Sequence, residues 1–227
     1  LPMSYDGLLL DHDGVIVTLG DHTALSDAAH GALRDVGVSD PAPDAVDTLS
    51  IAVSESELTA VSERYDLDPD VLWRARDDRV RDALLDETTT GRKAPYDDVA
   101  VLADCTLPMG IVSNNQTRIV NFVLDHYDID YHFETVHARA PDRSSLTRKK
   151  PRPTYLEEAM ATLDIDNPLY VGDSESDVQA GQRAGLDVAF LRRDHNADDA
   201  LDHEPTYDVG GLDAVVDILE SESARVR

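Results

Sequence analysis

The chain has 227 residues, of which 41% are hydrophobic, and its formal net charge at pH 7 is -26. This length suits one large domain or a core with a smaller inserted one, and the hydrophobic fraction excludes a disordered chain. The negative charge argues against nucleic acid and anionic membrane surfaces as partners, because both repel an acidic protein.

The basic residues are divided unevenly, because 17 are arginines and only three are lysines, namely Lys93, Lys149 and Lys150. Abundant aspartate with almost no lysine is typical of cytosolic proteins from salt-accumulating microbes, in which salt screens the self-repulsion. We therefore expect a halophilic, cytoplasmic protein, with an acidic mesophilic protein as the alternative.

Neither disulfides nor membrane segments are expected. The single cysteine, Cys105, excludes an intrachain disulfide and a cysteine-based metal cage. No apolar run is long enough to span a bilayer, and the first residues lack the pattern of a signal peptide.

The first part of the chain changes from a strand pattern to helical patterns. Residues 5–10 predict a strand buried on both faces, and residues 15–19 continue out of the loop after it. Helices are predicted at residues 24–36, after the capping box of Ser54 and Glu57, and after Asp68-Pro69. The segment 41–43 is expected to be a connector. Residues 17–90 thus predict an all-helical insertion that ends near the turn at 88–91.

The rest of the chain alternates between helix and strand patterns. Strands are predicted at residues 108–112, 133–137 and 188–191 and in a run that ends at Val171. Helices are predicted at residues 95–103, 117–126, 153–163, 176–184 and 212–219. Such alternation is typical of an α/β fold whose mostly parallel sheet carries helices on both faces.

Two carboxylates follow the first predicted strand. Asp11 comes directly after three leucines, and ligands bind at that edge of an open α/β sheet. A carboxylate there can attack phosphorus and form an aspartyl-phosphate. Asp13 lies on the same side of an extended chain, where it can exchange protons with a leaving group and an attacking water. Taken alone, the Asp-x-Asp-Gly pattern is equally typical of an ordinary turn.

Two further segments have the residue types that bind phosphate. Ser113 ends a predicted strand, and its hydroxyl with the amides of Asn114 or Asn115 can either bind phosphoryl oxygens or cap the next helix. Lys150 stands directly before a proline and a predicted helix, where its charge can stabilise a transferred phosphoryl group. For Lys150 and the adjacent Lys149, a solvated surface charge is the alternative.

A second pair of carboxylates, Asp173 and Asp177, follows the strand that ends at Val171. Hard oxygen ligands at a strand-to-helix turn suit Mg²⁺, which binds proteins through one or two carboxylates. The cation would orient Asp11 for in-line attack. The alternative is an acidic helix N-terminus that the helix dipole favours.

Together and in this order, the four motifs resemble the haloacid dehalogenase-like (HAD) hydrolase superfamily over nearly the whole chain. The helical insertion is similar to the small cap of phosphoglycolate phosphatase-like members. The resemblance implies a Rossmann-like α/β core, formed by residues 1–16 and 91–227, and an inserted small all-helical cap domain, formed by residues 17–90.

The resemblance also implies a role for each candidate residue. Asp11 would be the nucleophile and Asp13 the general acid and base, while Lys150 would balance charge. Ser113 and Asn114 would bind phosphoryl oxygens.

The same resemblance implies a magnesium site. Asp11, the backbone carbonyl of Asp13 and Asp173 would hold Mg²⁺, with Asp177 as a further ligand or as a partner of one. The dehalogenases of the superfamily work without metal and lack the second aspartate, so Asp13 favours phosphoryl chemistry. His12 stands where the family often has an aromatic or aliphatic residue, and we expect it to pack without a catalytic role.

Specificity in this family comes from the cap, where the sequence offers one cluster of four arginines, Arg74, Arg76, Arg79 and Arg81. They either face an anionic substrate or pair with Asp77, Asp78 and Asp82 on the same helix, and the pairing is the preferred interpretation.

These features predict a Mg²⁺-dependent phosphatase that acts on a small phosphorylated metabolite as a monomer or homodimer. One alternative is a phosphomutase of the β-phosphoglucomutase type, which returns the phosphoryl group to the sugar. The other is a catalytically silent phosphate-binding or regulatory module. Receiver domains are of that class, but they are shorter and the helical insertion does not suit them.

Overall fold

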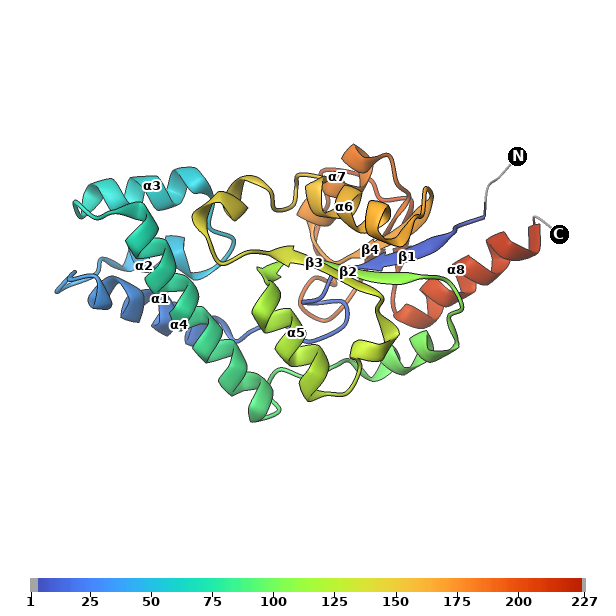
Figure 1. Cartoon of the computed structure of the whole chain (residues 1–227), viewed down its shortest axis with the longest axis horizontal. Coiled ribbons are helices and arrows are strands. Elements are labelled where there is room, and N and C mark those ends of the chain that lie inside the picture. The colour runs from blue at the N-terminus through green and yellow to red at the C-terminus, as the bar shows by residue number, and fades with distance from the viewer. Residues whose placement is uncertain (1–3, 226–227) are drawn as a thin grey trace.

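A six-stranded parallel sheet forms the centre of the computed structural model, which describes residues 4–225 (Figure 1). Its strands are β1 (Gly7–Leu10), β2 (Met109–Gln116), β3 (Thr135–Arg139), β4 (Pro168–Gly172), β5 (Val188–Leu191) and β6 (Tyr207–Val209). The strand order is β3-β2-β1-β4-β5-β6, so β1 lies between β2 and β4. This is the doubly wound order, in which ligands bind beyond the carboxyl ends of the strands where the order reverses. The predicted Rossmann-like α/β fold is therefore confirmed.

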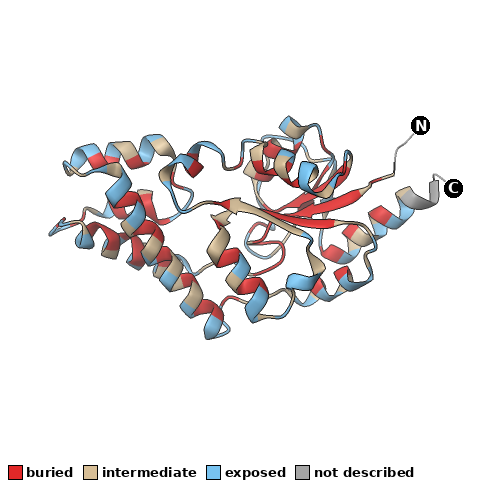
Figure 2. Ribbon diagram, in the orientation of Figure 1, coloured by how far each residue is buried: buried red, intermediate tan, exposed pale blue. Residues whose placement is uncertain are grey.

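Helices cover both faces of the sheet. Helices α5 (Thr117–His126) and α8 (Leu212–Arg225) pack on one face with Leu8 and Leu10 of β1. Helices α6 (Thr154–Leu163) and α7 (Glu175–Ala184) pack on the other face with Leu9. Because successive side chains of a strand point to opposite faces, β1 is buried along its whole length, as Figure 2 shows for the central strands.

Between β1 and β2 the chain forms four α-helices that lie at one end of the molecule, away from the sheet (Figure 1). They are α1 (His22–Asp35), α2 (Pro43–Ser50), α3 (Glu55–Arg64) and α4 (Pro69–Thr89). The capping box of Ser54 and Glu57 is present at the start of α3, and Asp68 caps α4 with a proline at its first turn. Both predicted helix starts are confirmed, because these local contacts satisfy backbone N–H groups that a helix start leaves open.

A few elements differ from the expectations. The predicted connector at 41–43 leads into α2, because Pro43 occupies a first-turn position where a missing N–H does no harm. The helix predicted at 95–103 is a 3₁₀ helix at Asp97–Asp104, and β6 was not predicted. Strand β2 continues past Ser113 to Gln116 with a shift in register. Among the helices in residues 4–225, none combines the length and apolar character that a membrane crossing requires.

Candidate active site

Four chain segments meet at the carboxyl edge of the sheet. Asp11 follows β1, Asp173 follows β4, and Ser113 lies in β2. Because Leu10 pairs with both Ile111 and Val171, the residues that follow these three positions on the neighbouring strands lie side by side. Lys150 enters from the loop before α6, so the four motifs expected from the sequence converge at one place.

Lys150 is the centre of the charged cluster. Its Nζ lies 2.9 Å from Asp11 Oδ1 and 2.6 Å from Asp177 Oδ1, and it donates to the Tyr170 hydroxyl at 3.0 Å. The side chain is buried. Burial lowers the pKa of Lys150, but the two carboxylates outweigh this effect and raise it above its ordinary value. Lys150 is therefore held as a cation between two aspartates.

Asp11, Asp173 and Asp177 form a buried trio whose oxygens lie within 4.8 Å of one another. Burial raises the pKa of Asp11, and the other two carboxylates raise it further against the opposing effect of Lys150. Three carboxylates beside one ammonium leave two negative charges in a buried site. This excess and these oxygen donors fit a divalent hard cation such as Mg²⁺.

The outer partners of the trio differ between its members. Asp173 Oδ2 lies 2.6 Å from His195 Nε2, and its backbone carbonyl accepts a hydrogen bond from Asn196 at 2.8 Å. Asp177 accepts a 2.6 Å hydrogen bond from the Tyr170 hydroxyl and caps α7. Burial would raise the pKa of Asp177, but Lys150 and the hydrogen-bond donors lower it. More hydrogen-bond donors of the protein thus contact the carboxylate of Asp177 than that of Asp173.

Asp13 lies beside the trio and has its own cation. Lys93 Nζ contacts Asp13 Oδ1, while Asn115 Nδ2 donates to Asp13 Oδ2 at 3.0 Å. His12, which is buried as expected, lies 3.2 Å from the same oxygen through Nδ1. Burial would raise the pKa of Asp13, but Lys93 and then His12 outweigh it and lower the pKa. The carboxylate is therefore ionised in this arrangement.

Sequence reasoning missed Lys93, which is fully buried just after the insertion. Its backbone N–H donates to Glu87 O, its backbone carbonyl accepts from the Tyr127 hydroxyl, and its Nζ donates to Thr18 O at 2.5 Å. One signal for it was present, because Lys93 is one of only three lysines in an arginine-rich chain. All three lysines lie in or beside this site.

Ser113 and Asn114 have different environments. Ser113 is buried, and its Oγ accepts a hydrogen bond from the Asn115 N–H at 3.0 Å. Asn114 Oδ1 accepts from the Lys150 N–H at 2.8 Å, and Asn114 Nδ2 donates to the Lys150 carbonyl at 3.0 Å. The Asn114 amide thus holds the backbone of Lys150, while Asn115 reaches Asp13. Phosphoryl binding by Ser113 and Asn114 stays a prediction.

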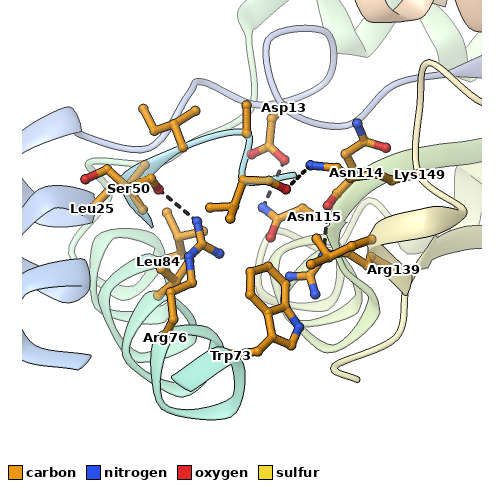
Figure 3. Close-up of a pocket in the computed structure, with 15 residues that line it drawn as sticks. Asp13, Leu25, Ser50, Trp73, Arg76, Leu84, Asn114, Asn115, Arg139 and Lys149 are labelled. Carbon is orange, nitrogen blue, oxygen red and sulfur yellow. Dashed lines mark hydrogen bonds between the residues drawn. The ribbon is translucent and has the colours of Figure 1, made fainter. Parts of the chain in front are cut away.

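A cavity of about 240 Å³ opens beside Asp13, Asn114 and Asn115 (Figure 3). Helices α1 and α4 and the loop after α2 line its far side, and Arg139 and Lys149 line it from the sheet side. Lys149, for which a solvated surface charge was one possibility, is half-buried and faces this cavity.

Of the four arginines of α4, Arg74 is exposed, and the other three form ion pairs with aspartates. Arg81 pairs with Asp78 and Asp82 on its own helix, as predicted. The prediction is wrong for Arg79, which pairs with Asp35 of α1 because the two helices pack together. Arg76 is buried, lies 3.3 Å from Asp77 and lines the cavity.

Comparison with known proteins gives one family match and partial relatives. A family model described as haloacid dehalogenase-like hydrolase matches residues 6–191. A phosphoglycolate phosphatase from Photorhabdus laumondii is 31% identical over 105 residues, which are 45% of this chain and 43% of that protein. An (S)-2-haloacid dehalogenase from Pseudomonas is 24% identical over 118 residues, 52% of this chain and 51% of that protein. The chain spans about half the length of the curated relatives it matches.

Solved structures share the fold over most of the chain. A phosphoglycolate phosphatase-type protein from Lactobacillus plantarum has a TM-score of 0.68 at 17% identity, covering 95% of this chain and 100% of that one. A β-phosphoglucomutase-type protein from Thermotoga maritima has a TM-score of 0.60 at 12% identity, covering 95% and 99%. Identities this low establish the fold alone.

Proposed function

Because the chain belongs to the haloacid dehalogenase-like hydrolase family, we propose that it is a Mg²⁺-dependent phosphatase of small phosphomonoesters. The observation that carries the proposal is the buried Asp11 carboxylate, which lies 2.9 Å from Lys150 Nζ and two residues before Asp13. A nucleophile, a cation and a proton-transfer group then meet at one sheet edge. The phosphatase names of relatives such as that from Photorhabdus laumondii agree with this chemistry.

In the first step, Asp11 attacks phosphorus, the bond from phosphorus to the ester oxygen breaks, and an aspartyl-phosphate forms. Lys150 lies against the attacking carboxylate, so its charge balances the negative charge that gathers there. The Ser113 hydroxyl, buried in β2, is placed to donate to a phosphoryl oxygen.

Asp13 transfers the protons in both steps. The leaving oxygen receives a proton from Asp13 in the first step. In the second step Asp13 takes a proton from the water that attacks phosphorus, the bond from phosphorus to the Asp11 oxygen breaks, and phosphate leaves. Lys93 favours the ionised form, which suits the second step. Binding of a negatively charged phosphate beside Asp13 raises its pKa, which favours the protonated form for the first step.

Asp11, Asp173 and the backbone carbonyl of Asp13 would hold Mg²⁺, with Asp177 as a further ligand or as a partner that orients them. The bound cation would neutralise charge between the nucleophile and the incoming phosphate. His195, at 2.6 Å from Asp173, and Asn196 fix the orientation of that aspartate.

The insertion at residues 17–90 is proposed to act as a cap that excludes water from the cavity. Three contacts support this role. Asp77 of α4 is bonded to Arg139, Gln116 donates to the Asp77 carbonyl at 2.9 Å, and Lys149 donates to the Val53 carbonyl at 2.6 Å. Each joins the insertion to the sheet side of the cavity.

The test is phosphate release from a panel of phosphomonoesters with MgCl₂ in concentrated KCl, which suits a chain of charge -26. Asp11→Asn is expected to abolish turnover while the fold survives, and Asp27→Asn, on the exposed face of α1, serves as the matched control. Turnover retained in Asp11→Asn would overturn the assignment of the nucleophile. Formation of an isomerised sugar phosphate without free phosphate would identify a phosphomutase. The absence of reaction with every ester of the panel would support the catalytically silent phosphate-binding module instead.

A further inference from the structure

A second hollow, a groove of about 460 Å³, lies at the loop before α6. Its lining comes from Ser54 before α3, from the loop between residues 146 and 153, and from Arg183 near the end of α7. Four of its eight lining residues are cations, and within residues 4–225 none of the lining is acidic. In a chain of net charge -26, such a surface runs against the overall composition.

Three of the four cations in the groove have no carboxylate to balance them. The ammonium of Lys150 lies between Asp11 and Asp177, so its charge is compensated. Most other lysines and arginines are also ion-paired. Among the side chains that the structure describes, those without a carboxylate oxygen within 4.0 Å are Arg34, Arg74, Lys149, Arg152 and Arg183. The unpaired positive charge of the protein is therefore concentrated in this groove.

Neutral acceptors hold two of these cations in place. Arg183 donates to the Pro151 carbonyl at 2.6 Å and to the side-chain oxygen of Gln179 at 3.2 Å. Lys149 donates to the Val53 carbonyl at 2.6 Å. These contacts fix the cations without cancelling their charge, so the groove is preorganised for an anion.

The cation with the least solvent around it is Lys149, which is half-buried. Burial lowers its pKa to about 8, and the neighbouring Arg139 and Arg76 contribute to the shift. The carboxylates that oppose the shift, Glu57 and Asp77, are hydrogen-bonded elsewhere, to the start of α3 and to Arg139. A half-buried ammonium beside two guanidiniums is unfavourable until an anion joins it.

The number and type of the cations indicate which anion fits. Arg152 comes from the loop and Arg183 from α7, so one carboxylate or chloride would neutralise only part of the charge. Two linked phosphoryl groups carry several negative charges and offer oxygens to both guanidiniums, whose planar forks match such oxygens. The volume of about 460 Å³ lies within the ~300–1,000 Å³ of small-molecule pockets.

We propose that this groove binds the diphosphate group of a small metabolite, at a place separate from the candidate active site. Arg152 and Arg183 line the groove and are absent from the lining of the cavity beside Asp13. Binding at these two residues does not depend on the phosphatase reaction, so the inference stands apart from the proposed function.

The test compares methylenediphosphonate with methylphosphonate by calorimetry, in KCl of constant ionic strength and at a pH below the pKa of Lys149. The carbon–phosphorus bonds of both probes resist hydrolysis, and EDTA removes Mg²⁺, which a diphosphonate would chelate. The wild type is expected to bind the diphosphonate at least about 10-fold more tightly, because the second phosphonate adds charge-assisted contacts.

The double variant Arg152→Gln with Arg183→Gln is expected to lose at least about 10-fold in affinity for methylenediphosphonate. Its matched control is Arg148→Gln with Arg192→Gln, which removes the same charge from two arginines that pair with carboxylates and do not line the groove. The control should bind like the wild type. Ser113→Ala, at the candidate active site, should also bind like the wild type.

Three results would overturn the proposal. The first is equal affinity of the wild type for the two probes. The second is equal weakening in the groove variant and its control, which would mean that only the overall charge matters. The third is loss of binding in Ser113→Ala with retention in the groove variant, which would assign the anion to the candidate active site. Should the double variant fail to fold, Arg152→Gln alone must still weaken binding, because this side chain is exposed.

Discussion

The ion pair between Asp77 and Arg139 is expected to be a main link between the insertion and the sheet. Both side chains are almost fully buried, with 1% and 4% of their surface exposed, and the pair makes two hydrogen bonds across 62 residues of sequence. Removal of Arg139 leaves the buried Asp77 carboxylate with only the 3.3 Å contact to Arg76, and the loss of one partner of a buried pair destabilises a protein by up to about 3–5 kcal/mol. Arg139→Met should therefore lower the free energy of unfolding by that amount.

Urea unfolding at fixed KCl concentration measures this loss, and the exposed pair of Arg79 and Asp35 supplies the control. Those side chains are 48% and 44% exposed, so Arg79→Met should lose no more than about 1 kcal/mol. The triple variant Arg76→Met, Asp77→Leu and Arg139→Met should recover part of the loss, because all three charges of the buried cluster are then removed together. A loss below about 1 kcal/mol in Arg139→Met would refute the reasoning that burial makes this pair important.

Three further predictions concern other parts of the molecule. Lys93→Met should lower kcat on the order of 10²-fold while KM stays unchanged, because Asp13 loses the ammonium that positions it; an increase in KM alone would contradict this. The contacts of Asp177 lower its pKa in the folded protein, so they stabilise the fold above the unfolded-state pKa and this stabilisation is lost as the pH falls. The difference in unfolding free energy between the wild type and Asp177→Asn should therefore narrow below about pH 4. A difference that stays constant with pH would exclude a stabilising contribution from the ionised Asp177. The thermal unfolding midpoint should rise between about 0.1 and 1 M KCl, because the Debye length falls to ~3 Å and salt screens the self-repulsion of the -26 charge. A midpoint that does not change with KCl concentration would argue against self-repulsion as the dominant effect of this charge.

The sequence was a good guide where a local pattern determines the structure. The capping box at Ser54 and the proline start of α4 depend on neighbouring residues, so both could be recognised from spacing. Asp11 and Asp173 could be placed at one sheet edge because parallel strands end together. Helix α2 and strand β6 are short, with 8 and 3 residues, and carry too few periodic positions to be distinguished from loops.

Contacts between distant residues could not be predicted in this way. Lys93 and Asp13 are 80 residues apart, and their pairing depends on how the insertion returns to the sheet. The same holds for Asp77, which helical spacing assigned to its neighbours on α4 but which Arg139 binds from the end of β3. The ion-pair partners of Asp13 and Asp77 therefore depend on how the chain packs around the insertion.

The most direct test of the central claim is to trap the phosphorylated intermediate. Borohydride added during turnover reduces an aspartyl-phosphate to homoserine, and peptide mass spectrometry locates the reduced residue. We predict homoserine in place of Asp11 in the presence of substrate, and an unmodified side chain in Asp11→Asn. Reduction at another aspartate, or continued phosphate release with Asp11 never modified, would contradict nucleophilic attack by this carboxylate.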